Sequence, residues 1–98
     1  MSFTVLLSDD ALEEFEDVIN YYELISETVR KKFIKEFDKT ISILSENPYY
    51  QIQYDDIRLK QVKGFPILLH FIVYTETRTV IIYGVRHGKQ NPENYPKP

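Results

Sequence analysis

The chain has 98 residues, the size of one domain, and 43% of them are hydrophobic, which excludes a disordered protein. It contains no Cys, which excludes disulfides and thiolate zinc sites, and two His are too few to anchor a metal without converging carboxylates. The net charge of −3 hides a division, because residues 1–56 hold 13 Asp/Glu and 5 Lys/Arg, whereas residues 57–98 hold 2 and 7. The two parts therefore carry net charges of −8 and +5.

The N-terminal residues lack the basic start and the long apolar run of a signal peptide. The longest apolar run, about eight residues around His70, is too short to span a membrane. We therefore expect a cytoplasmic protein that has no membrane contact and that needs neither a cofactor nor a metal.

The acidic part predicts one strand and two helices. A short apolar run predicts a strand over residues 3–7, and apolar residues at helical spacing predict an amphipathic helix over 10–24. A second apolar series predicts a helix over 27–46, for which Ser26 is a candidate N-cap and Pro48 a stop signal. The linker of about two to four residues predicts an antiparallel helical hairpin.

The basic part predicts three strands, over residues 57–63, 67–74 and 79–85. A four-residue hairpin loop, 75–78, joins the last two. The proline-rich residues 91–98 predict a flexible tail, because proline cannot pair deeply in a sheet. No linker long enough to divide the chain is present, so residues 1–98 form one domain.

The predicted fold class is α+β, in the order strand, helix, helix, strand, strand, strand. The helical hairpin is the only candidate to cover one face of a small, mainly antiparallel sheet. The other face is then left exposed or waits for a partner, and a mixed apolar and basic face usually binds something.

Strand alternation predicts what each face shows. If Ile57 and Leu59 face the helices, then Arg58, Lys60 and Val62 point away from them. In the next strand, four residues would face the helices (Ile67, Leu69, Phe71 and Val73). The four between them would point outward (Leu68, His70, Ile72 and Tyr74). The last strand is ambiguous, because both of its alternating sets are mainly apolar.

The exposed cations suggest phosphate chemistry. His87 is the best candidate for acid–base catalysis, because an imidazole titrates near neutral pH, and Arg86 has the planar fork that clamps a phosphate. Arg58, Lys60 and Lys89 are candidate phosphate-binding residues. The alternatives are a strand-end His bonded to the backbone, an Arg86 salt bridge to an acidic helix, and a solvated strand face for Arg58 and Lys60.

Other polar and aromatic residues are interpreted as structural. His70 lies in the most apolar strand, where a histidine bonded within or beside the core is more common than a catalytic one. Tyr49, Tyr50 and Tyr54 are interpreted as packing under the sheet edge, and binding of a partner is the alternative. The acidic helix face is interpreted as a surface that keeps the protein soluble.

An ordered set of short motifs resembles the RelE/ParE superfamily of toxins from bacterial type II toxin–antitoxin systems, over about residues 3–95. The matching segments are Leu44-Ser45-Glu46-Asn47-Pro48, Ile57-Arg58-Leu59, Phe65-Pro66 before a strand that ends in Tyr74, and Val85-Arg86-His87-Gly88-Lys89 followed by Asn91-Pro92. The resemblance implies a toxin that a cognate antitoxin neutralises, in a possible toxin–antitoxin hetero-oligomer.

The resemblance implies two targets. RelE-like members enter the ribosomal A site and cut mRNA, whereas ParE-like members poison DNA gyrase and are not nucleases. In some relatives a C-terminal aromatic residue stacks on a base, which makes Tyr95 a candidate for binding the substrate. Three hypotheses remain at this point: an mRNA-cleaving toxin, a gyrase-directed toxin, and a non-toxic binding module of the same fold that acts only through protein partners.

Overall fold

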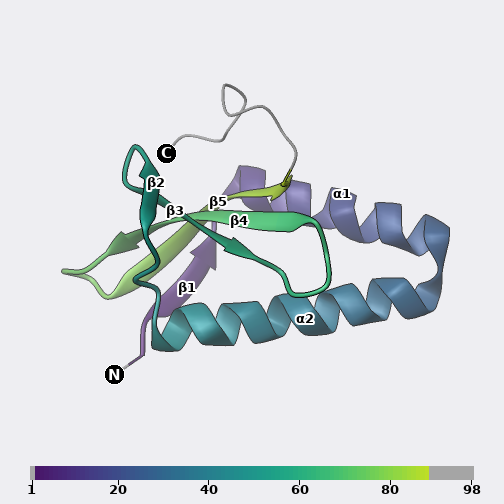
Figure 1. Cartoon of the computed structure of the whole chain (residues 1–98), viewed down its shortest axis with the longest axis horizontal. Coiled ribbons are helices and arrows are strands. Elements are labelled where there is room, and N and C mark those ends of the chain that lie inside the picture. The colour runs from purple at the N-terminus through teal and green to yellow at the C-terminus, as the bar shows by residue number, and fades with distance from the viewer. Residues whose placement is uncertain (1, 89–98) are drawn as a thin grey trace.

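The computed structural model describes residues 2–88 and has two layers, a helical hairpin and a five-stranded sheet (Figure 1). The elements are β1 (Thr4–Leu7), α1 (Asp9–Ile25), α2 (Glu27–Glu46), β2 (Ile52–Tyr54), β3 (Ile57–Gln61), β4 (Ile67–Tyr74) and β5 (Thr79–His87). The predicted fold class is therefore confirmed. The three-residue strand β2 was not predicted, and residues 91–98 lie outside the described part.

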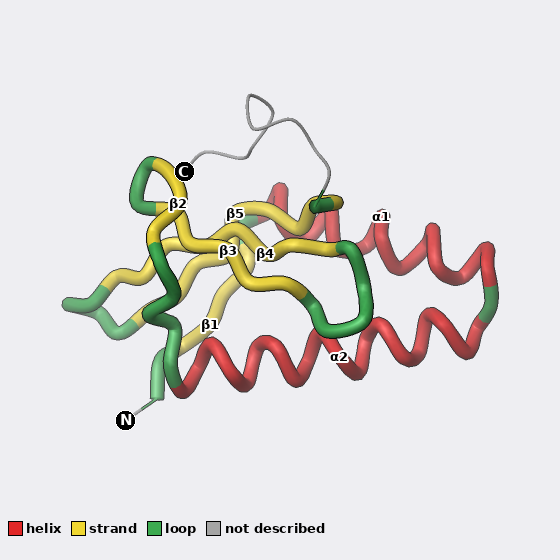
Figure 2. Tube along the Cα trace, viewed as in Figure 1, coloured by secondary structure: helices red, strands yellow, loops and turns green. Residues whose placement is uncertain are grey.

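The helical hairpin is held by capping at both helix starts. The Ser8 Oγ accepts a hydrogen bond from the Ala11 N–H at 3.1 Å, and the Ser26 Oγ accepts one from the Val29 N–H at 3.0 Å. Ser26 also ends α1, because its own N–H donates to the Tyr22 carbonyl at 3.0 Å. The connection is thus a single residue, shorter than predicted, and the two helices run side by side past the end of the sheet (Figure 2).

The sheet has the order β1-β5-β4-β3-β2, with β1 parallel to β5 and the other pairs antiparallel. The pairing of β4 with β5 shifts register, since His70 lies opposite Gly84 whereas the next residue, Phe71, lies opposite Ile82. Tyr83 is therefore the extra residue of a β-bulge, and the alternation of β5 changes phase there. This bulge explains why both alternating sets of the last strand are apolar.

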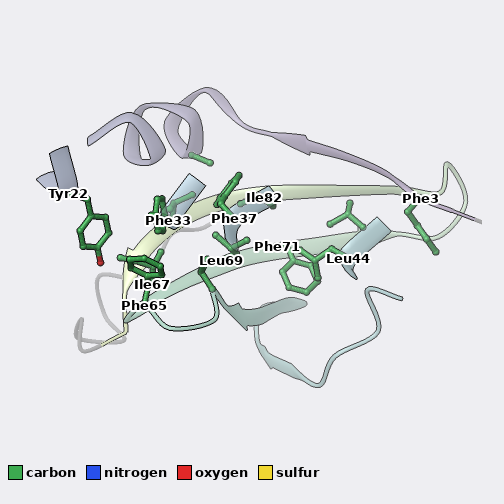
Figure 3. Close-up of a cluster of buried hydrophobic side chains, with 14 residues drawn as sticks. Phe3, Tyr22, Phe33, Phe37, Leu44, Phe65, Ile67, Leu69, Phe71 and Ile82 are labelled. Atoms are coloured by element: carbon green, nitrogen blue, oxygen red, sulfur yellow. The ribbon is translucent and has the colours of Figure 1, made fainter. Parts of the chain in front are cut away.

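The main core lies between the helices and one face of the sheet, here called the helix face. It runs from Tyr22 at the tip of the hairpin to Phe3 at the opposite end (Figure 3). Phe33 is fully buried at its centre, with ring centroids 5.3 Å from Tyr22 and 5.1 Å from Phe65. Phe65, in the turn between β3 and β4, therefore ties that turn to both helices.

We expect Phe33→Ala to lower the free energy of unfolding by about 3–5 kcal/mol, because it empties a closely packed aromatic site. Leu24→Ala is the control, since Leu24 is 87% exposed at the hairpin tip, and it should change stability by less than about 0.5 kcal/mol. Urea denaturation followed by circular dichroism measures both values. Equal effects of the two substitutions would contradict the described core.

Candidate functional site

Arg58 and Lys60 lie on the helix face, opposite to the predicted direction. In the register of β3 with β4, Arg58 pairs with Phe71 and Lys60 with Leu69. Both partners belong to the main core, and paired residues of neighbouring strands point to the same side. The prediction was wrong because it assumed that only one face of β3 is apolar, whereas Ile57 is fully buried on the other face.

Aromatic residues hold both cations in place. The Arg58 Nε donates to the Tyr50 carbonyl at 2.6 Å, and its guanidinium lies 5.5 Å from the centre of the Tyr49 ring. The Lys60 Nζ lies 4.8 Å from the centre of the Tyr50 ring. These cation–π contacts fix the two side chains beside the segment that follows α2. The tyrosine cluster thus packs at the sheet edge, and it also positions cations.

Arg86 is paired with an acidic residue of α1. Its Nε donates to one carboxylate oxygen of Glu14, and the other oxygen accepts the Val85 N–H at 3.0 Å. The side chains are 28% and 22% exposed, so the pair is partly shielded from water. Of the alternatives for Arg86, the salt bridge to an acidic helix is therefore the one observed. No sequence pattern pointed to Glu14, which belongs to a face interpreted as a solubility surface.

His87 and Arg86 point to opposite faces of β5. His87 pairs with Ile67, a core residue of the helix face, whereas Arg86 pairs with Leu68 on the other face. The His87 side chain is exposed, and it lines a shallow depression together with Arg86 and with Glu14 and Asp17 of α1, so the two candidates share this depression. His87 therefore lies against α1, while Lys60 lies in a groove against α2. Lys89 and Tyr95, the remaining candidates, lie outside the described residues.

The second face of the sheet carries a smaller buried cluster around His70. His70 is fully buried, and its Nδ1 lies 3.0 Å from the hydroxyl of Tyr54. Burial and, as the smaller cause, the positive charge of Arg86 together lower the pKa of His70 to about 4. Ile57 and Ile72 are buried on the same face. A neutral, buried imidazole agrees with the structural interpretation of His70.

Two tyrosines extend this second face toward the β4–β5 hairpin. The hydroxyls of Tyr74 and Tyr83 lie 2.8 Å apart, and this hydrogen bond, together with burial, raises the pKa of Tyr83 to about 12. The Tyr83 hydroxyl is therefore a neutral hydrogen-bonding group near pH 7. The face offers tyrosine hydroxyls and apolar side chains, which suit the binding of a protein partner better than proton transfer.

Within residues 2–88, His, Asp and Glu side chains form no group of three that would hold a metal. Neither of the two described helices is long and apolar enough to cross a membrane.

Comparisons with known proteins agree with the fold. A family model described as the ParE toxin of the type II toxin–antitoxin system parDE matches residues 5–92. A chain from the chromosomal ParDE system of P. aeruginosa superimposes with a TM-score of 0.72 at 12% identity, covering 87% of this chain and 95% of that one. A mutant of the E. coli toxin RelE in the free state gives 0.65 at 17% identity, covering 91% and 86%. No curated protein sequence matches.

We expect the stability to fall by about 2 kcal/mol between pH 7.5 and pH 5 because of His70. The folded-state pKa, about 4, lies below the ordinary histidine pKa of 6.5, so protonation favours the unfolded chain. The stabilising contribution is complete above pH 6.5 and is lost as the pH falls toward 4. Urea denaturation at both pH values should show a smaller loss for His70→Gln. His87→Gln is the control and should keep the parent loss, and equal losses in all three proteins would contradict the assignment.

Proposed function

Because this chain belongs to the ParE toxin family, we propose that it arrests growth by binding DNA gyrase and that a cognate antitoxin neutralises it. The family assignment rests on the match of the family model over residues 5–92 together with the shared fold. A toxin of this kind needs a binding surface and no catalytic group. The resemblance to RelE keeps mRNA cleavage as the rival mechanism.

The surroundings of the candidate catalytic groups support binding over cleavage. Cutting RNA through its 2′-hydroxyl requires an acid, a base and cations around one phosphate. His87 and Arg86 line one shallow depression, but Glu14 and Asp17 line it too, so two carboxylates face one arginine there and disfavour a phosphate. Lys60 lies elsewhere, in the groove beside α2.

The second face of the sheet is the surface that we assign to the antitoxin. It combines the tyrosine hydroxyls of Tyr74 and Tyr83 with apolar residues such as Ile81. A segment that folds on binding can cover such a surface and order itself in the process. A cognate antitoxin is also consistent with the ParDE system to which the P. aeruginosa chain belongs. Arg58 and Lys60 are excluded from this contact because they lie on the helix face.

Inducible expression tests the mechanism. We expect the parent protein to arrest growth, to inhibit DNA supercoiling by purified gyrase, and to leave mRNA intact in primer extension. His87→Ala should arrest growth within about twofold of the parent, because a binding toxin does not use an imidazole for proton transfer, whereas a nuclease would lose about 10²–10⁴-fold in rate. Co-expression of the neighbouring antitoxin gene should restore growth.

New mRNA ends that disappear in His87→Ala, with normal supercoiling, would show the nuclease mechanism instead. If cells grow normally while they produce soluble, folded parent protein, the hypothesis of a non-toxic binding module is the one supported. Leu24→Ala serves as the matched control, because it changes an exposed residue at the hairpin tip.

A further inference from the structure

A groove of about 540 Å³ runs between α2 and the turn that joins β3 to β4. The described residues that line it are Glu36, Lys39, Thr40, Ile43, Lys60, Gln61, Lys63 and Gly64. Gly64 adopts a φ of +83°, and a Cβ placed there would meet no atom within 4 Å, so the groove is open at this rim. A ligand wider than the groove can therefore rest on it.

The groove is positively charged although the whole chain is acidic. Three lysines, Lys39, Lys60 and Lys63, face one carboxylate, Glu36, among the described residues that line it. The Lys39 Nζ lies 3.5 Å from that carboxylate, which therefore offsets one of the three charges. The groove thus keeps an excess of about two positive charges, which attracts anions.

The lysine-lined wall continues along α2. Lys32 and Lys35 lie seven and four residues before Lys39, so helical periodicity places all three on the same flank of the helix. At a rise of about 1.5 Å per residue, Lys32 and Lys39 are about 10 Å apart along the axis. This distance equals about three base-pair steps of duplex DNA, which carries a phosphate on each strand at every step of about 3.4 Å.

The residues of the groove suit phosphates and not bases. Its described lining contains no aromatic ring on which an unpaired base could stack, and the Tyr50 ring nearby is occupied by the Lys60 ammonium. Lysines act as point charges that contact phosphates without reading the sequence. A duplex presents its phosphates in a regular array and keeps its bases stacked inside.

We propose that this lysine groove binds the phosphate backbone of duplex DNA. The inference rests on the proposed function, because gyrase holds duplex DNA and a toxin bound there would lie beside it. Lys60 of the groove lies on the helix face, whereas we assign the antitoxin to the second face, so Lys60 would not take part in both contacts.

Fluorescence anisotropy with a labelled 20-base-pair duplex and the purified full-length chain tests the inference over a series of salt concentrations. We expect the triple variant Lys39→Gln, Lys60→Gln, Lys63→Gln to bind about tenfold or more weakly. The slope of log affinity against log salt should fall by about 2 to 3, since each lost phosphate contact removes about 0.9. Glu36→Gln should bind more tightly than the parent, because it removes the carboxylate of the groove.

Arg30→Gln is the matched control, because Arg30 pairs with Glu27 at 3.8 Å and lies nine residues, about two and a half turns, before Lys39, on the opposite side of α2. It should bind DNA like the parent. Circular dichroism of each variant shows whether it is folded. No duplex binding by the parent at low salt, or an equal loss in Arg30→Gln and a folded triple variant, would overturn the proposal. Equal or tighter binding of a single-stranded RNA of the same length would also overturn it.

The gyrase assay separates the two proposals. If the chain inhibits gyrase but does not bind duplex DNA, DNA binding by the groove is refuted and gyrase remains supported as the target. If the chain binds duplex DNA through these lysines but has no effect on gyrase, DNA binding by the groove is supported and gyrase is refuted as the target.

Discussion

The bulge at Tyr83 determines where the charged end of β5 points. Before it, Val80 and Ile82 face the helices, and after it Val85 does, so the strand keeps its core contacts across a change of phase. The same change sends Arg86 to the second face, where Glu14 of α1 pairs with it. If Tyr83 instead paired with His70 and the alternation continued unbroken, Arg86 would lie on the helix face. The separation of Arg86 from the lysines of the helix face therefore depends on this bulge.

The two helices differ in charge, although both lie in the acidic part of the sequence. The first helix carries seven acids and no Lys or Arg, namely Asp9, Asp10, Glu13, Glu14, Glu16, Asp17 and Glu23. The second carries five cations, of which four are lysines, and four acids. A protein of low isoelectric point thus presents an acidic side at α1 and a basic groove at α2. The net charge alone conceals this second feature, because it averages over the two helices.

The sequence predicted both helices, four of the strands and the outward and inward residues of β4, because each depends on local periodicity and breakers. It did not predict the phase of β3 or the direction of Arg58, since a strand with apolar residues on both faces has two self-consistent alternations. The bulge in β5 and the strand β2 were also missed, because both arise from pairing between segments. The pairing of Glu14 with Arg86 spans 72 residues in the chain and leaves no local pattern.

The Glu14 carboxylate also bears on how the sheet ends. Strand β1 leaves β5 where the Ser8 N–H donates to the Ile82 carbonyl at 2.9 Å, so the Val85 N–H would otherwise be open to another chain. A carboxylate oxygen of Glu14 accepts that N–H. The opposite edge of the sheet is β2, which is only three residues long and is followed by Asp55 and Asp56. Both borders thus carry the short strands and negative charges that discourage strand addition. Self-association through edge-to-edge pairing, the usual route to fibrils for a small sheet, is disfavoured at each of them.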